Sequence, residues 1–204
     1  MGRVSDAKEK LMGAVLELIW KGSYGSTTID QICEKAEVKK GSFYYFFESK
    51  SDLAAAALSA DWKKRQPEWD AIFSPTVPPL ERLQRFCDCG YQNQKDLQCQ
   101  CGCVLGCPLF TLGSEVCTQE VTLHAKIKEI LGLIHKYIES AIRDAHANGE
   151  IEAPDAAAKA RILFAYSEGL MTQARILNDA EILREMAEGV FSILGVKQVR
   201  RIAA

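Results

Sequence analysis

The stretch from Thr27 to Asp52 constrains the fold more than any other part of this chain, because it predicts two short helices joined by a tight turn. Thr28 and Gln31 have the spacing of a capping box, in which two side chains satisfy free backbone N–H groups at a helix start. Behind this cap, apolar residues recur at i, i+3, i+4 and i+7, which indicates one buried helical face. They are Ile29, Ile32, Cys33 and Ala36. The pattern breaks at Glu37, where we expect the turn.

A second short helix is predicted from about residue 39 to residue 47. Phe43 and Phe47 are four residues apart, so they share one face and should pack inward with Val38. The remaining positions carry lysine, hydroxyl and aromatic side chains on the sides and outer face: Lys39, Lys40, Ser42, Tyr44, Tyr45 and Phe46. Lysines neutralise DNA phosphates, and aromatic and hydroxyl groups reach bases or backbone. The pattern therefore indicates a helix that enters a DNA groove.

This two-helix segment resembles the helix-turn-helix of the TetR family of bacterial transcriptional regulators. The resemblance is carried by Thr27-Thr28-Ile29, Ile32, Ala36, Val38, Lys40-Gly41-Ser42-Phe43-Tyr44, Phe47 and Ser49-Lys50. It is close over the N-terminal residues and extends to the rest of the chain in helix layout. It implies an all-α fold in which an N-terminal three-helix DNA-binding domain (residues 1–50) is followed by a larger helical domain for effector binding and dimerisation (residues 51–204).

The resemblance also implies roles for individual residues. Thr28, Tyr44 and Lys50 are expected at phosphates, the last from the first turn of the next helix, where the helix dipole also favours an anion. Near base edges we expect Lys40, Ser42 and Tyr45, with Lys39 beside them. Phe46 stands where the family often has His and can touch a thymine methyl group.

One position departs from the family pattern. Glu37 occupies the turn where the family usually has Gly. If this turn requires a left-handed backbone, a residue other than Gly costs about 1 kcal/mol there. Glu37 also places a negative charge near the surface that faces DNA.

Helical patterns dominate the rest of the chain, and no segment has strand periodicity. An amphipathic helix at about residues 6–22 should brace the two-helix segment. The next helix runs from about 49 to 66, where Pro67 should kink or end it, and residues 74–79 form a loop. Further helices are predicted from Leu80 onward, at about 123–145, at 154–177 and at 181–194.

The last two helices, 156–177 and 181–194, are more apolar than a surface helix requires, and they contain small residues that permit close approach. Ordinary core packing explains this composition. The resemblance, however, implies that they form a two-fold, four-helix interface of a homodimer. A dimer places two reading helices on the half-sites of a palindromic operator.

A cysteine-rich segment is the most unusual feature. Cys99, Cys101 and Cys103 alternate, Cys107 follows, and Cys117 lies further on. Three interpretations remain open: small apolar filler, a redox or electrophile sensor, and a site for a soft metal such as Cu(I), Zn(II) or Cd(II). The spacing matches no zinc-finger pattern. Gly102-Cys103-x-x-Gly106 resembles an element that shapes the regulatory domain in one branch of the family.

These observations predict a ligand-responsive dimeric regulator, a repressor that leaves its operator when an effector binds. The effector is a small organic molecule or a thiol-reactive or metal signal, and no cofactor is required. Candidate pocket residues are Phe86, Tyr91, Cys103, Phe110 and Phe164. A helical binding module without specific DNA binding and a thiol redox enzyme remain alternatives. Against an enzyme, the chain has no Cys-x-x-Cys, phosphate-binding glycine loop or hydrolase nucleophile motif.

Composition limits the setting in which the chain works. Its N-terminus is polar, without the apolar core of a signal peptide, and no apolar run approaches the length of a membrane span. We therefore expect a cytoplasmic protein with no membrane partner and with mostly reduced cysteines. The net charge of −2 does not indicate nucleic-acid binding. That prediction depends on the placement of Lys39, Lys40 and Lys50.

Overall fold

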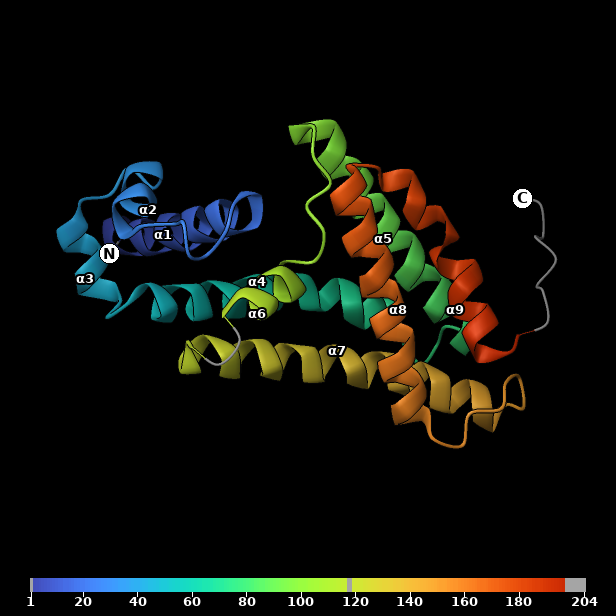
Figure 1. Cartoon of the computed structure of the whole chain (residues 1–204). Helices are drawn as coiled ribbons and strands as arrows, with labels where there is room; N and C mark the ends of the chain where they lie inside the picture. The colour runs from blue at the N-terminus through green and yellow to red at the C-terminus, as the bar shows by residue number, and fades with distance from the viewer. Residues whose placement is uncertain (1, 117–118, 197–204) are drawn as a thin grey trace. The chain divides into compact units, whose positions relative to one another are not determined.

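The computed structural model describes residues 2–116 and 119–196, and every regular element within these ranges is a helix (Figure 1). In chain order they are α1 (Gly2–Lys21), α2 (Ile29–Lys35), α3 (Lys40–Phe46), α4 (Lys50–Ile72), α5 (Pro79–Cys101), α6 (Pro108–Val116), α7 (Val121–Ala147), α8 (Ala156–Leu177), the 3₁₀ helix η1 (Ala180–Glu185) and α9 (Met186–Leu194). The predicted all-α fold is confirmed. Cys117 lies outside the described residues.

The helix ends follow local side-chain chemistry. The predicted capping box of α2 is present: the Gln31 N–H donates to Thr28 Oγ1 at 3.2 Å, and the Thr28 N–H donates to Gln31 Oε1 at 2.8 Å. The Asp155 side chain accepts from the Ala158 N–H and starts α8, which ends at Asn178 in the left-handed conformation (φ 52°). The predicted last helix is divided into η1 and α9.

Pro67 does not end α4, which continues to Ile72. The helix end predicted at about residue 66 is therefore wrong, and the kink predicted as the alternative stays a prediction. A proline inside a helix costs about 3 kcal/mol or more, because it removes one hydrogen bond and crowds the preceding turn. The residues beyond it join an aromatic cluster, in which Trp69 stacks on Phe73 at 5.7 Å between ring centroids and both contact Tyr137. Each such pair contributes about 0.5–1.5 kcal/mol, which offsets the loss.

The chain divides into two compact units, Met1–Gln66 with Pro108–Leu131 and Pro67–Cys107 with Gly132–Ala204. Helix α6 and the first part of α7 thus group with the N-terminal helices. The domain boundary proposed at residue 50 stays a prediction.

The first unit is built around α1, which packs against α2, α3 and α6. Leu11, Val15 and Ile19 of its predicted apolar stripe are buried, as are Ile32 of α2 and Phe43 of α3. The bracing role predicted for this helix is confirmed. Packing against α1 and α2 therefore holds α3 in a fixed orientation within this unit.

The second unit packs α5 and α8 against η1 and α9. Its largest buried side chains include Leu83, Leu163 and Leu183. Helices α8 and α9 approach closely at Gly189, where an added Cβ would lie 1.9 Å from Tyr166 Oη. Only glycine permits this contact.

Candidate DNA-reading site

The turn between α2 and α3 has the strained geometry that its sequence suggested. Glu37 adopts φ 55°, which is the left-handed region. The Val38 N–H donates to the Cys33 carbonyl at 2.9 Å and closes the turn. A glycine would adopt this conformation without the cost of about 1 kcal/mol that a Cβ imposes.

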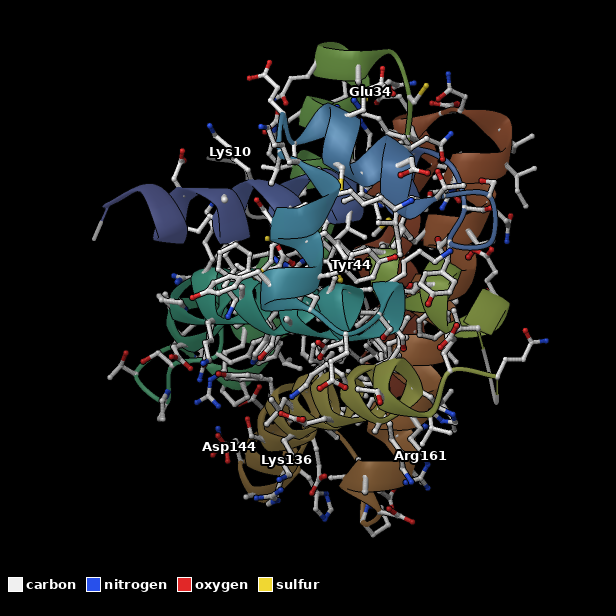
Figure 2. The ribbon with its side chains drawn as sticks, turned by 90° about the vertical axis from the view of Figure 1, so that its left-hand side faces the viewer. Lys10, Glu34, Tyr44, Lys136, Asp144 and Arg161 are labelled. Atoms are coloured by element: carbon white, nitrogen blue, oxygen red, sulfur yellow. The ribbon has the colours of Figure 1, made fainter. Side chains whose placement is uncertain are left out.

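Helix α3 presents an aromatic surface. Tyr44 and Tyr45 are 57% and 76% exposed, whereas Phe43 and Phe47 are buried as predicted. Tyr44 is labelled on α3 in Figure 2. Lys39 and Lys40 at the start of the helix are exposed, and Ser42 and Phe46 are half-buried at its sides. Lys40, Ser42, Tyr44, Tyr45 and Phe46 thus share one short helix whose opposite face is held in the core, whereas Thr28 caps α2 and Lys50 begins α4.

Lys40 is paired with Asp30 of α2 at 2.7 Å. The hydrogen bond to Asp30 raises the pKa of Lys40, so the lysine remains charged. The pair connects the starts of α2 and α3 at the surface.

Lys50 lies at the first turn of α4, as predicted, but its ammonium is engaged within the protein. Nζ donates to the carbonyls of Tyr24 and Thr27, both at 2.7 Å, and lies 4.1 Å from the centroid of the Tyr24 ring. Burial lowers the pKa of Lys50. Because an ammonium has three N–H donors, one remains for a phosphate.

Two carboxylates also hold this loop, residues 22–28. Glu115 of α6 accepts the Tyr24 N–H at 2.9 Å and the Gly25 N–H at 2.6 Å. The Tyr24 hydroxyl donates to Glu120 Oε1 at 3.0 Å. Burial, followed by the contact with Glu120, raises the pKa of Tyr24. This clamp positions the loop that leads directly into the Thr28 cap.

The sequence did not predict the Glu115 clamp. Glu115 lies 90 residues from Gly25 and belongs to no local pattern with it. The one indirect signal is Gly25 itself, since an added Cβ would lie 3.1 Å from Glu115 Oε1.

The five candidate pocket residues have separate surroundings. Phe86 packs against Trp69 and Phe73, and Phe164 meets His135 edge to face at 5.0 Å. Cys103 is exposed in a loop. Phe110 belongs to α6 and is 37% exposed, while Tyr91 joins a polar network. A shared pocket for these residues stays a prediction.

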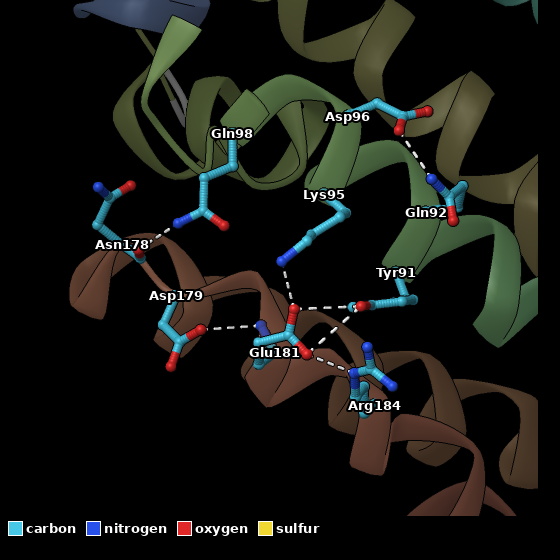
Figure 3. Close-up of polar contacts among 9 residues, drawn as sticks. All are labelled: Tyr91, Gln92, Lys95, Asp96, Gln98, Asn178, Asp179, Glu181 and Arg184. Carbon is cyan, nitrogen blue, oxygen red and sulfur yellow. Dashed lines mark hydrogen bonds and ion pairs between the residues drawn. The ribbon is translucent and has the colours of Figure 1, made fainter. Parts of the chain in front are cut away.

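The polar network around Tyr91 joins α5 to η1 (Figure 3). Glu181 is ion-paired with Lys95 and Arg184 and accepts a hydrogen bond from the Tyr91 hydroxyl at 3.2 Å. Hydrogen bonds from Lys95 and then Arg184 lower the pKa of Glu181 to about 2. The network therefore persists across the neutral and mildly acidic range.

Among the described cysteines of this segment, Cys99 and Cys101 lie on a different element from Cys103 and Cys107. Cys99 and Cys101 end α5, whereas Cys103 lies beyond Gly102, which ends the helix with φ 75°. The face that Cys103 would share with Cys99 or Cys107 on a continuous helix is therefore absent. Among residues 2–116 and 119–196, no three His, Cys, Asp or Glu side chains are placed to hold a metal ion together.

Two amides fasten the loop that follows α5. Gln94 Oε1 accepts the N–H groups of Leu105 and Gly106 at 3.0 and 2.9 Å. Asn178, which ends α8, accepts the Val104 N–H at 2.9 Å and donates to the Gly102 carbonyl at 3.0 Å. The loop that carries Cys103 is thus held between α5 and α8.

A buried carboxyl lies next to the last cysteine of the segment. Glu168 of α8 is 7% exposed and forms a side-chain hydrogen bond with Cys107. Its Oε2 is buried and has no hydrogen-bond partner among the described residues. Burial raises the pKa of Glu168 to about 7, and the contact with Cys107 opposes this rise. Sequence reasoning missed Glu168, although a glutamate on an apolar helix was a visible signal.

In the part of the chain that the structure describes, each helix is either too short or too polar to cross a bilayer.

Comparison with known proteins agrees with this geometry. The model of the bacterial regulatory proteins of the tetR family matches residues 11–57, and that of the tetracyclin repressor-like C-terminal domain matches residues 79–190. The transcriptional regulator AcuR of Cereibacter sphaeroides is 30% identical over 158 residues, which are 76% of this chain and 70% of that protein. The HTH-type transcriptional repressor NemR of Escherichia coli is 24% identical over 95% of this chain and 96% of its own.

A solved structure shares the whole architecture. The regulatory protein TetR from Rhodobacter sphaeroides superposes with a TM-score of 0.79 and 26% sequence identity, over 92% of this chain and 98% of that one. These relatives are transcriptional regulators rather than enzymes. The chain therefore belongs to the TetR family of bacterial regulatory proteins and is a ligand-responsive, DNA-binding transcriptional regulator.

Proposed function

We propose that this regulator is a cytoplasmic repressor that binds a palindromic operator as a homodimer and leaves it when an effector binds. The observation that carries the proposal is the exposure of Tyr44 and Tyr45 on a short helix whose opposite face is buried. Large aromatic side chains are rarely left in water without a partner. A DNA groove gives these two side chains phosphates and base edges to contact.

The proposed DNA contacts divide into two groups. Thr28, Tyr44 and Lys50 bind phosphates and set the orientation of α3. Lys39, Lys40, Ser42, Tyr45 and Phe46 lie near base edges and determine the sequence that is bound. Phosphate contacts weaken with salt, whereas base contacts change sequence preference.

The proposed dimer interface is formed by the segments 156–177 and 181–194, which correspond to α8 and to η1 with α9. Along α8, Ile162 is 54% exposed and Ile176 is 75% exposed, and Gly169 between them is also exposed. A Cβ added at Gly169 would meet no atom within 4 Å. An apolar stripe with a glycine at its centre suits the close approach of a second helix.

The effector is proposed to be a small organic molecule or a thiol-reactive or metal signal. The dimer has two conformations, and only one of them matches both half-sites of the operator. The effector binds the other conformation more tightly and so favours release from DNA. Phe86, Tyr91, Cys103, Phe110 and Phe164 remain the proposed pocket residues. The loop carrying Cys103 is held by Asn178 at the end of α8, which supports a route from this region to the proposed dimer helix.

The proposal is tested by a gel shift with the DNA upstream of the protein's own gene. We expect wild type to shift one fragment in the presence of excess non-specific competitor, and Tyr45→Ala to lose preference for that fragment. Glu150→Ala, at an exposed residue after α7, is the matched control and should bind as wild type does. Failure of wild type to prefer any upstream fragment would overturn the proposed operator binding.

A further inference from the structure

Glu168 and Cys107 form a buried carboxyl–thiol pair that the proposed DNA contacts do not use. Glu168 projects from α8, and Cys107 ends the loop that joins α5 to α6. Only 7% of the surface of Glu168 is exposed, whereas Cys107 is partly accessible to solvent. The pair therefore combines a base shielded from water with a sulfur that a reagent can reach.

The arrangement is costly for stability. A buried polar atom without a hydrogen-bond partner lowers the stability of the folded state, and more so when it is charged. Glu168 Oε2 is such an atom. Buried carboxyls with this kind of perturbation concentrate at functional sites, where the altered proton affinity has a use.

In this geometry, the Glu168 carboxylate can accept the proton of the Cys107 thiol. A thiol reacts as its thiolate, and a hydrogen-bonded base that takes the proton as the sulfur attacks accelerates the reaction. Burial raises the pKa of Glu168 to about 7, which brings its proton affinity closer to that of a cysteine thiol.

We propose that Cys107 is a covalent modification site for α,β-unsaturated carbonyl compounds, with Glu168 as the base that activates it. The thiol proton moves to Glu168 as the sulfur forms a bond to the β-carbon and the C=C π bond opens. The resulting enolate then takes a proton from Glu168 at the α-carbon. The product is a thioether, and Glu168 returns to its starting state without any oxidant or reductant.

The consequence for DNA binding rests on the proposed function. Cys107 is followed by Pro108, the first residue of α6, and Glu115 near the end of α6 clamps the loop that precedes α2. An adduct at Cys107 alters the start of the helix that carries this clamp. Modification is therefore expected to lower operator affinity.

The chemistry is tested by site-resolved labelling of the full chain with N-ethylmaleimide. Samples are quenched over time at neutral pH, digested, and analysed by mass spectrometry, which gives a separate rate for each cysteine. Cys103 is exposed and serves as the reference thiol in every sample. We expect Cys107 to react at least as fast as Cys103, although it is less exposed.

The decisive variant is Glu168→Gln, which keeps the size of the side chain but removes the base. We expect it to slow the labelling of Cys107 at least about tenfold, because a positioned general base contributes about 10²–10⁴ in rate. The rate at Cys103 should not change. Cys33 and Cys87 are buried, one in each unit, so their protection in the same samples shows that the variant is folded.

Two labelling results would overturn the proposal: a Cys107 rate well below that of Cys103 in wild type, or an unchanged Cys107 rate in a folded Glu168→Gln protein. If Glu168→Gln exposes Cys33 or Cys87, Glu168→Met replaces the carboxyl by an apolar side chain of similar length. The same slowing at Cys107 is then expected.

DNA binding is measured separately by fluorescence anisotropy. Labelled wild type should lose operator affinity, whereas Cys107→Ser should retain it after identical treatment. If unlabelled wild type binds no operator, the proposed function fails while the labelling result stands. If labelled wild type still binds with unchanged affinity, the regulatory role of Cys107 is wrong.

Discussion

Glu115 Oε1 accepts the backbone N–H of Gly25 at 2.6 Å, so a side chain of α6 fixes the loop from which α2 starts. The other carboxylate oxygen accepts the Tyr24 N–H at 2.9 Å. A carboxylate that satisfies two consecutive N–H groups defines the path of the backbone between them. The geometry of the DNA-reading helices therefore depends on a residue outside them.

Glu115→Ala is expected to weaken operator binding while leaving its salt dependence unchanged, because Glu115 positions the loop and contacts no phosphate. The loss of two partly exposed hydrogen bonds should lower the free energy of unfolding by about 1 kcal/mol. Fluorescence anisotropy at several salt concentrations, with thermal unfolding alongside, measures both effects. An affinity equal to that of wild type would show that the clamp has no role in binding.

Lys50→Ala is expected to weaken binding to all DNA sequences alike. It should also reduce the slope of log affinity against log salt concentration by about 1, as the loss of one phosphate contact does. The variant also loses the two carbonyl contacts that hold the loop. Glu115→Ala is its natural comparison, since it disturbs the same loop without removing a cation. If both variants have the wild-type slope, Lys50 acts only within the protein.

Glu37→Gly is expected to raise the free energy of unfolding by up to about 1 kcal/mol, because glycine adopts φ 55° without steric cost. The gain is reduced by the greater freedom of glycine in the unfolded chain. Chemical denaturation measures the change, and Glu34→Gly, within α2, is the matched control, which should be destabilised. A loss of stability in Glu37→Gly would show that the glutamate side chain has a favourable role there.

Gly169→Glu is expected to give monomers and to abolish specific operator binding. The side chain has open space within the protomer, so folding should be retained, but a charge would lie within the proposed interface. Light scattering at micromolar concentration measures the oligomeric state. A wild-type monomer, or a Gly169→Glu dimer, would exclude this face of α8 as the interface.

Glu168 is expected to make the protein less stable as pH rises. Its pKa is 4.5 in the unfolded reference and about 7 in the folded protein, so the folded state binds the proton more tightly. Its contribution is fully present below pH 4.5 and is lost as pH rises through 7, by about 3 kcal/mol in total. In Glu168→Gln this part of the pH dependence should disappear. Denaturation curves across this range, compared between the two proteins, measure the difference. Parallel curves would contradict the raised pKa.

The local part of the fold was predictable from sequence because its determinants are close in the chain. The capping box of Thr28 and Gln31 and the inward face of Phe43 and Phe47 depend on spacings of three and four residues, and both are confirmed. The end predicted at Pro67 failed because tertiary contacts of the following aromatic residues outweigh a local signal.

The contacts that sequence could not supply are those between distant segments. Lys50 was placed correctly at the start of α4, but its carbonyl partners depend on how the 22–28 loop folds back. Glu168 lies 61 positions after Cys107 in the sequence, and no periodic pattern connects two single residues on different elements. Clamps and reactive pairs of this kind become visible only when the packing is known.

The span between Tyr24 and Glu115 has a consequence for synthesis on the ribosome. Glu115 is added 91 residues after Tyr24, which takes roughly 5 to 18 seconds at translation rates of about 5–20 residues per second. In this interval α2 and α3 are synthesised after α1, while the loop between α1 and α2 still lacks its carboxylate partner. The nascent chain therefore acquires its DNA-reading geometry late, when α6 has left the exit tunnel.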